Sequence, residues 1–559
     1  MHPKGSKLIA GQSLTVDPGT METTTDAVPP SAGNKSPANG SGKPPQAAAS
    51  TEIELKLLAD PQRLGDLAQS PVVALYSKGR GAVHQLVATY YDTPDLALKK
   101  AGYAMRVRRS GQRFIMTLKT DQPLGSDMLR RGEWETPVPG PEPDRQWLLS
   151  RLPEEKRKAL EPMQLEPVFT TQVRRETHML TLPSGQVELA LDRGQIISDS
   201  RSDEISEAEL ELKEGNAALL FQIAHELNAT TPLRPSTDTK AARGFRLFQQ
   251  CAPETRKPPK LSLGPKLPLD DALAEILRAA LLHLLDNQAA AADGRDPEGV
   301  HQVRVALRRL RAALSLIRHF APSVTIDALR ADAQWLASAM GDARNWDVFL
   351  TQALPEIEKG CPSADGFGPL RAASESIRKS AYEKAVAALS NPRTGQFAIN
   401  LGLWIEQRGW RADVSTGTLA ELAAPAADFG RQILERRHEK ALKRGRGLSK
   451  LSVDERHKLR LALKKLRYTA DFFLPLIGKR KNAARYGRQL AALQDVFGQY
   501  NDAMTTIGLM AELRRHGLPQ EAQMAGGAVM GWAASTLSHM DPQLQSAWKD
   551  FTTKGLLEA

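Results

Sequence analysis

The sequence contains little cysteine, few aromatic residues and no long apolar run. Only Cys251 and Cys361 occur among 559 residues, which excludes a disulfide framework or a cysteine-based zinc site and suits a reducing cytoplasm. No run of about 18 apolar residues is present, so we expect no membrane span. A Gly-rich loop ending in Lys and Ser or Thr is also missing, which excludes the P-loop enzymes.

Positive charge is concentrated in the second half of the chain. The net charge is +11, and residues 261–559 hold 41 Lys and Arg against 32 Asp and Glu, a net of +9. Such an imbalance predicts an anionic partner for the C-terminal half, provided that the charges cluster in space.

Composition divides the chain into four segments. Residues 1–50 are rich in Pro, Gly, Ser, Thr and Ala, and we expect them to be disordered. Residues 51–250 alternate in a β-like pattern, with Pro and Gly between the runs. A breaker-rich linker at 251–268 precedes residues 269–556, in which apolar residues recur at the helical spacing.

Charged residues of the β-rich segment alternate strictly with apolar residues. Glu52, Glu54 and Lys56 share one strand face, and Ile53 and Leu55 share the other. The same alternation recurs along the later runs, so a closed barrel would enclose a lumen lined by carboxylates and cations. Carboxylates suit Mg²⁺ or Mn²⁺, and Arg and Lys suit phosphate oxygens. These are the groups that phosphoryl transfer requires.

An ordered series of motifs in this segment resembles the CYTH domain, the triphosphate tunnel metalloenzymes. The series comprises Glu52-Ile-Glu54-Leu-Lys56, Tyr90–Asp95, Met105–Arg108, Thr117–Lys119, Arg131–Glu135, Val187–Gly194, Glu207–Leu212 and Lys240–Gly244. The resemblance implies an eight-stranded antiparallel β tunnel or barrel that hydrolyses inorganic triphosphate or related triphosphates with a divalent metal.

The resemblance also implies roles for individual residues. The expected metal ligands are Glu52, Glu54, Glu209 and Glu211. The expected phosphate ligands are Lys56, Arg106, Arg108, Lys119, Arg131, Arg175 and Lys240. For the catalytic group we expect Lys56 and a glutamate that orients the attacking water, either Glu207 or Glu211. Parity favours Arg175 over Arg174 as the inward residue, although a β-bulge would reverse this.

The helical half contains an internal repeat. Gly299–Arg311 matches Glu455–Arg467 at an offset of 156 residues, which predicts two copies of a four-helix bundle. Each copy carries a basic stripe at helical spacing, and a pair of such helices would present cations to a linear polyanion. The stripes consist of His301, Arg304, Arg308 and Arg311, and of His457, Arg460, Lys464 and Arg467.

This repeat resembles the CHAD domain, a histidine-containing helical domain often fused to CYTH, and the pairing resembles bacterial inorganic triphosphatases. The resemblance implies that the two stripes bind inorganic polyphosphate. The predicted fold is therefore multidomain α+β: an eight-stranded antiparallel tunnel with helices, followed by an all-α domain of two repeated bundles. We expect the protein in the cytoplasm, in association with polyphosphate granules.

Other interpretations stay open. The charged strand faces and basic stripes could be solvated surfaces with ion pairs, although few acidic residues accompany the stripes. The tunnel could cyclise ATP as an adenylate-cyclase-like enzyme, or the chain could be mainly a polyphosphate-binding or granule-targeting protein with weak catalysis. Sparse aromatic residues on the stripes disfavour nucleic acid as the partner.

Overall fold

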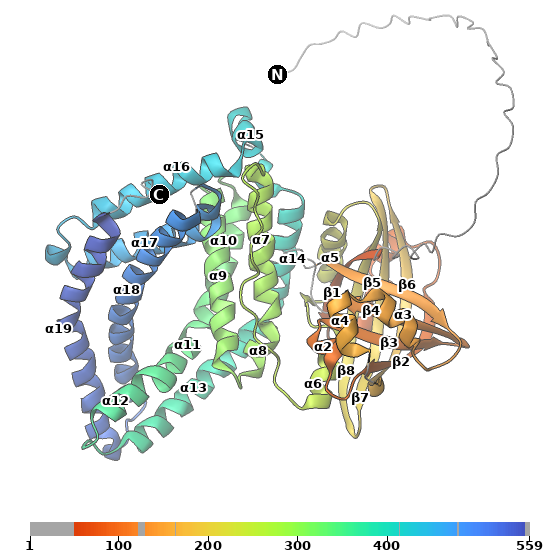
Figure 1. The fold of residues 1–559 in the computed structure, drawn as a ribbon, viewed down its shortest axis with the longest axis horizontal. Coiled ribbons are helices and arrows are strands. Elements are labelled where there is room, and N and C mark those ends of the chain that lie inside the picture. Colours follow the sequence, from red (N-terminus) through yellow and green to blue (C-terminus); the bar gives the residue numbers. More distant parts are fainter. Residues whose placement is uncertain (1–49, 121–128, 162–163, 413, 478–479, 554–559) are drawn as a thin grey trace, which may run out of the picture. The chain divides into compact units, whose positions relative to one another are not determined.

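A computed structural model describes residues 50–120, 129–161, 164–412, 414–477 and 480–553 (Figure 1). The segment predicted to be disordered, residues 1–50, lies outside the described residues except for Ser50. The last three residues of the predicted helical segment, 554–556, also lie outside them.

The β-rich segment forms nine strands in the described residues. Their bounds are Ser50–Ala59 (β1), Ala82–Asp92 (β2), Tyr103–Ser110 (β3), Arg113–Thr120 (β4), Arg130–Val138 (β5), Glu166–Leu182 (β6), Gly185–Ser198 (β7), Arg201–Glu214 (β8) and Leu233–Pro235 (β9).

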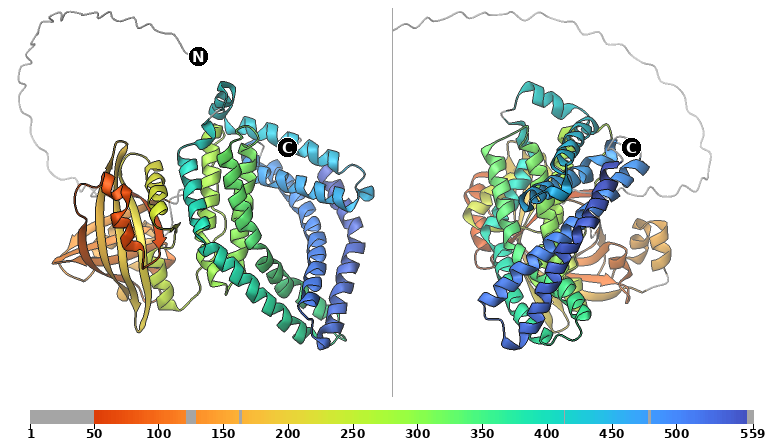
Figure 2. Two further views of the ribbon diagram at one scale, coloured as in Figure 1. Left: turned by 180° about the vertical axis from the view of Figure 1, so that it is seen from behind. Right: turned by 90° about the vertical axis from the view of Figure 1, so that its left-hand side faces the viewer.

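Eight of these strands close into an antiparallel barrel. The pairing order runs β5-β4-β3-β2-β6-β7-β8-β1, and β1 also pairs with β5. One edge of β1 is shared, because residues 50–53 pair with β5 while Leu57–Ala59 pair with β9. Figure 2 shows from behind how the strands curve around the barrel. The predicted eight-stranded antiparallel barrel is confirmed, with β9 as a short addition.

Short helices accompany the barrel strands. They are Pro71–Tyr76 (α1), Ala97–Lys100 (α2), Arg145–Arg151 (α3), Glu154–Leu160 (α4), Ala218–Thr230 (α5) and Lys240–Gln249 (α6). The fully buried Leu55 and Leu57 of β1 share one apolar cluster with Leu220 and Ile223 of α5, and α5 contacts β1. The period-two pattern thus buries the apolar side chains of β1 outside the lumen and turns its charged side chains inward.

The linker after the barrel is hydrogen-bonded to the helices that follow it. The main-chain N–H of Arg256 donates to Asn287 Oδ1 at 2.8 Å, and Asn287 Nδ2 donates to the Arg256 carbonyl at 3.0 Å. Further along, the Leu267 carbonyl accepts from the main-chain N–H of Ala426 at 2.8 Å. The breaker-rich composition therefore produces an extended segment held against the helical half.

The remaining helices form the all-α half. Their bounds are Leu269–Asp286 (α7), Gln288–Asp293 (α8), Pro297–Ile317 (α9), Val324–Ala339 (α10), Gly341–Val348 (α11), Leu354–Gly360 (α12), Phe367–Ser390 (α13), Pro392–Glu406 (α14), Thr416–Ala423 (α15), Ala426–Arg444 (α16), Val453–Ile477 (α17), Arg480–Arg515 (α18) and Gln523–Thr553 (α19). An all-α domain after the barrel is the predicted arrangement.

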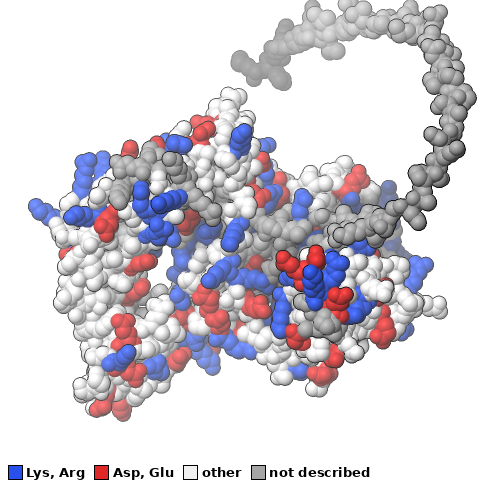
Figure 3. All heavy atoms as spheres, in the orientation of Figure 1, with Lys and Arg blue, Asp and Glu red and all other residues white. Residues whose placement is uncertain are grey.

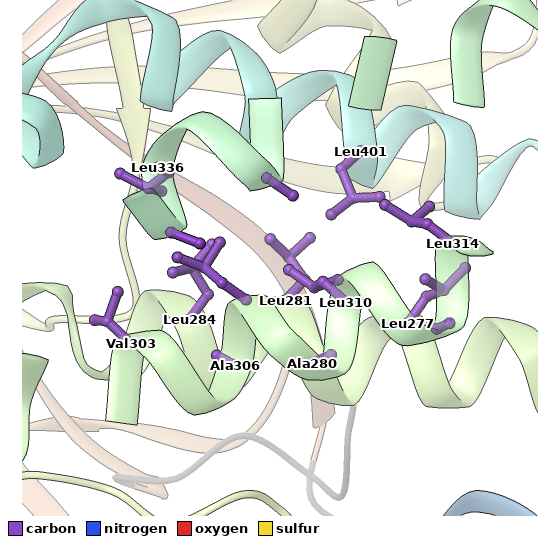
Figure 4. Packing of buried hydrophobic residues seen from close by; sticks show 14 of the residues in the cluster. Leu277, Ala280, Leu281, Leu284, Val303, Ala306, Leu310, Leu314, Leu336 and Leu401 are labelled. Atoms are coloured by element: carbon purple, nitrogen blue, oxygen red, sulfur yellow. The ribbon is translucent and has the colours of Figure 1, made fainter. Parts of the chain in front are cut away.

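Leucine-rich helix faces build the core of the first repeat. Leu281 of α7, Leu310 of α9, Leu336 of α10 and Leu401 of α14 meet in one buried layer (Figure 4). The second repeat packs α16 along α17 and α18 along α19. The repeated motif lies in α9 and α17, whose apolar sides are buried, so the basic stripes occupy the other sides of these helices. Within the described residues, no helix is long and apolar enough to cross a membrane.

Candidate functional site

The barrel encloses a charged cavity of about 330 Å³. Its lining includes eight Lys and Arg side chains and seven Glu side chains. Such a balance is costly to bury without a ligand, because charges withdrawn from water need compensating partners. The cavity therefore has the composition expected for a bound anion together with a cation.

Three lining carboxylates occupy one row across adjacent strands. Glu54 of β1 lies directly opposite Glu211 of β8, which in turn lies directly opposite Glu188 of β7. Like charges in register repel one another, and the ammonium of Lys213 contacts Glu211 at 2.6 Å. An all-oxygen row of this kind fits a hard divalent cation such as Mg²⁺ or Mn²⁺.

A second group of carboxylates lies deeper and is held by cations. We define the buried ion cluster as Lys56, Arg175, Asp192, Glu207, Glu209 and Lys240. Lys240 Nζ contacts Glu209 at 2.8 Å and Asp192 at 2.7 Å, and Lys56 Nζ contacts Glu207 at 2.7 Å. Arg175 donates two hydrogen bonds to Asp192, at 2.7 and 2.6 Å, and also contacts Glu209. One oxygen from each of Asp192, Glu207 and Glu209 lies within 4.8 Å of the others.

The cluster fixes the charge states of its members. Burial acts to raise the pKa of Glu209, but the ammonium of Lys240, then Lys56 and Arg175, hold that pKa well below its usual value. Burial acts to lower the pKa of Lys240, yet Asp192, Glu207 and Glu209 outweigh it and raise that pKa well above its usual value. The carboxylate is therefore ionised and the lysine protonated across the neutral range.

The opposite wall of the cavity carries arginines that lack tight carboxylate pairing. Arg106 lies 3.5 Å from the Tyr90 hydroxyl, and Arg108 lies 3.5 Å from Glu135. The neighbouring Arg106 guanidinium lowers the pKa of Arg108, with burial acting in the same direction. Two adjacent guanidinium groups at a cavity wall favour a multiply charged anion between them and the lysines.

Lys119 and Lys240 connect these walls. Lys119 Nζ contacts Glu52 at 2.6 Å and Glu133 at 3.2 Å. Lys240 is the first residue of α6, and the Thr239 hydroxyl caps this helix by accepting from the main-chain N–H of Ala242 at 3.0 Å. The cap fixes where the helix begins, so that the Lys240 side chain enters the barrel.

The structure brings most of the predicted tunnel residues together. All of the predicted metal ligands and all of the predicted phosphate ligands line the cavity. Arg175 points inward, while Arg174 is exposed and contacts Glu176 at 3.4 Å. The β-bulge between β2 and β6 falls at Tyr90 and Tyr91, opposite Phe169 and Pro167, so it leaves the parity of Arg175 unchanged.

Glu207 differs from the other predicted residues because it lies beneath the cavity. Its side chain is 0 % exposed, one oxygen binds Lys56 and Lys240, and the other has no hydrogen-bond partner among the described residues. Of the two glutamates proposed to orient water, Glu211 is the one that lines the cavity.

Several residues of the tunnel site were not among the predicted ligands. Asp192 anchors two cations of the buried ion cluster, and Glu133, Glu135 and Glu188 line the cavity. Their positions alternate in step with the predicted ligands, which indicates that they share the lumen face. Alternation alone does not predict which side chains lie opposite one another on neighbouring strands.

The predicted basic stripes of the helical half converge. We define the central cationic face as Arg304 and Arg308 of α9, Arg344 of α11, and Arg460 and Lys464 of α17. Arg308 Nε donates to the Tyr468 hydroxyl of α17 at 2.9 Å. Burial, followed by Arg460, Arg308 and Arg304, lowers the pKa of Lys464 to about 8. Cations from both repeats therefore act on one another across this face.

Other members of the stripes are placed differently. His301 adjoins the face, since burial and then Arg344 lower its pKa, whereas His457 is exposed. Arg467 forms an i,i+4 pair with Asp471 at 3.1 Å, which is the arrangement expected of a solvated helix face.

A closed barrel with a charged lumen, followed by a repeated helical half with converging cationic stripes, defines a CYTH domain joined to a CHAD domain. Residues 50–245 match the CYTH domain family and residues 275–511 match the CHAD domain family. The chain belongs to the proteins that carry these two domains in this order.

A curated relative is similar to part of the chain. The chain is 34% identical over 200 residues to the inorganic triphosphatase of Haemophilus influenzae, a match that covers 35% of this chain and 54% of that protein. The chain thus matches about half the length of this curated relative.

Solved structures resemble each half separately. The CHAD domain from the plant Ricinus communis shares 30% identity, with a TM-score of 0.47, and the match covers 53% of this chain and 96% of that one. A Hippeastrum protein, described as a candidate adenylyl cyclase with a dominant triphosphatase activity, shares 17% identity with a TM-score of 0.26 over 36% of this chain and 95% of that one.

Proposed function

We propose that the barrel hydrolyses inorganic triphosphate to diphosphate and phosphate with Mg²⁺ or Mn²⁺, and that the helical half binds inorganic polyphosphate. The observation that carries the first part is the cavity itself, in which a row of opposed carboxylates faces a set of Lys and Arg side chains. The likeness to an inorganic triphosphatase supports the same reaction.

In this proposal, cations on different walls of the cavity bind different oxygens of the triphosphate. Arg106 and Arg108 on one wall bind phosphate oxygens, and Lys119 and Lys240 bind the remaining oxygens from the sides. Because the cations are held by strand pairing and by buried carboxylates, they are already oriented when the substrate enters. Positioning and charge stabilisation of this kind provide most of the catalysis in phosphoryl transfer.

The carboxylates provide the site for the divalent cation. Glu54, Glu188 and Glu211 would hold it from one row, with Glu52 and Glu209 nearby on the same lumen. When bound, such a cation offsets charge on the phosphates and lowers the pKa of water. Glu211 would accept a proton from the attacking water, whose oxygen forms a bond to the terminal phosphorus as the bond to the diphosphate oxygen breaks.

Polyphosphate binding by the helical half is supported by the central cationic face. Two arginines of this face donate to neutral oxygens: Arg308 to the Tyr468 hydroxyl, and Arg304 to the Ala337 carbonyl at 3.1 Å. Their charges are therefore not offset by these partners and can attract a linear polyanion in a salt-dependent manner.

Phosphate release from inorganic triphosphate, ATP and thiamine triphosphate tests the proposed reaction. We expect rapid release from inorganic triphosphate with Mg²⁺ or Mn²⁺, and its loss in Glu54→Ala. The matched control is Glu204→Gln, because Glu204 lies on β8 with its side chain exposed. Faster turnover of ATP with cyclic product would favour the cyclase alternative. No release from any substrate, with polyphosphate binding intact, would leave polyphosphate binding as the main function.

A further inference from the structure

A second group of cations lies on the outer side of α17, where it packs along α16. We define the outer cationic face as Arg437, Lys440 and Arg444 of α16 and Lys465 of α17. The three α16 residues follow one another at spacings of three and four, which places them on one stripe of the helix. The stripe extends over two turns, about 10 Å. In Figure 3, Lys and Arg side chains gather over the part of the molecule where Figure 1 places α16 and α17.

Hydrogen bonds join this stripe to α17 through neutral oxygens. Arg437 donates to the Lys465 carbonyl at 2.8 Å and also bonds the Thr469 hydroxyl, and Arg444 donates to the Lys458 carbonyl at 2.8 Å. Within the described residues, none of the four members of the outer cationic face forms a salt bridge. Burial and then Arg437, Lys440, Arg444 and Arg330 lower the pKa of Lys465, as expected for cations gathered without acidic partners.

The outer and central cationic faces are continuous with each other. Lys464 of the central face and Lys465 of the outer face are neighbours, separated by about 100° around the helix. Arg330 of α10 adds a further cation between the helices, because its charge lowers the pKa of both Arg311, in the basic stripe of α9, and Lys465. Arg330 also contacts Asp327 at 3.1 Å, so its own charge is partly offset.

From this continuity we infer that the polyanion path does not end at the central cationic face but continues over α16 and α17, so that the helical half distinguishes long from short polyphosphate. A short polyphosphate chain contacts only the central cationic face. A longer chain reaches the outer cationic face and gains additional charge contacts there. This inference rests on the proposed polyphosphate binding and extends it to chain length.

Binding of short-chain and long-chain polyphosphate to the full chain, at one fixed salt concentration, tests the inference. Lys440→Gln with Lys465→Gln removes two exposed cations whose side chains form no hydrogen bond or salt bridge with the described residues, so folding should be retained. We expect about tenfold weaker binding of long-chain polyphosphate, which is a change in binding energy that two charge contacts can supply. Binding of short-chain polyphosphate should change less than about twofold.

Two further variants test whether the effect on long chains is specific to the outer cationic face. Arg460→Gln with Lys464→Gln, on the central cationic face, should weaken both chain lengths. Lys379→Gln with Lys384→Gln removes the same charge from exposed positions on α13 and should weaken neither. Circular dichroism of each variant checks that the helices are intact.

The possible outcomes separate the inference from the function on which it rests. Equal weakening of short and long chains by the Lys440 and Lys465 variant, or no weakening, would overturn the longer path. No effect of the Arg460 and Lys464 variant on either chain would instead overturn polyphosphate binding by the central cationic face. Loss of RNA binding without loss of polyphosphate binding in the Lys440 and Lys465 variant would assign the outer cationic face to nucleic acid and overturn the inference.

Discussion

Replacing Glu209 by Gln should destabilise the barrel because this carboxylate contacts three buried cations. It is bonded to Lys56, Lys240 and Arg175, and its side chain is 13 % exposed. Gln has nearly the same size, so the change removes charge while leaving the packing in place. Among the described residues, the three cations would then share Asp192 and Glu207, with Glu54 at 3.8 Å from Lys56. Removing one partner of a buried ion pair costs about 3–5 kcal/mol.

Hydrogen exchange measured by mass spectrometry can locate this effect. A loss of about 3 kcal/mol corresponds to exchange roughly a hundredfold faster for amides that open with the barrel. We expect the acceleration in peptides from β1, β7 and β8, and not in peptides from α16–α19. Glu204→Gln, on the exposed side of β8, serves as the control.

The effect should depend on pH in a defined direction. Because the pKa of Glu209 in the folded protein lies well below 4.5, its stabilisation is fully present above pH 4.5. It is lost as pH falls through the lower folded-state pKa. The stability gap between wild type and Glu209→Gln should therefore be constant at neutral pH and should narrow in acid. Unchanged exchange in β8 at neutral pH would refute the argument that Glu209 holds the buried ion cluster together.

Three other changes test separate parts of the structure. Arg108→Gln should lower kcat/KM for triphosphate by about tenfold to a hundredfold, which is the range for loss of one charged hydrogen bond. Arg109→Gln, on the exposed side of β3, should leave kcat/KM unchanged. Equal losses of kcat/KM in the two variants would argue against an inward role for Arg108. Polyphosphate affinity should fall as pH rises through about 8, where Lys464 loses its proton, and Lys464→Arg should flatten that fall. Gly194→Ala should destabilise the barrel, because its Cβ would lie 1.9 Å from the Gln172 carbonyl oxygen; an unchanged thermal midpoint would contradict the close strand packing.

The barrel was predictable because strand alternation records which side chains share a face. Glu52, Glu54 and Lys56 enter the lumen while Leu55 packs outside it. Alternation does not record strand register, however. The row formed by Glu54, Glu211 and Glu188 depends on how β1, β8 and β7 align, and no local pattern fixes that alignment.

The sequence also does not predict how deeply a lumen-facing side chain is buried. Glu207 has the same parity as Glu209 and Glu211, yet it lies below the cavity because Lys56 and Lys240 cover it. In the helical half, spacing identified the stripes of α9 and α17. Arg344 was missed because it approaches them from α11, a contact that depends on helix packing.

We propose that the opposed carboxylates of the barrel form a divalent-cation site used in triphosphate hydrolysis. The most direct test is the rate of phosphate release from inorganic triphosphate across a Mg²⁺ titration, for wild type, Glu188→Gln and the Glu204→Gln control. We predict that Glu188→Gln requires more Mg²⁺ for half-maximal rate, while Glu204→Gln follows wild type. Identical Mg²⁺ dependence in all three proteins, or release that needs no divalent cation, would contradict the account.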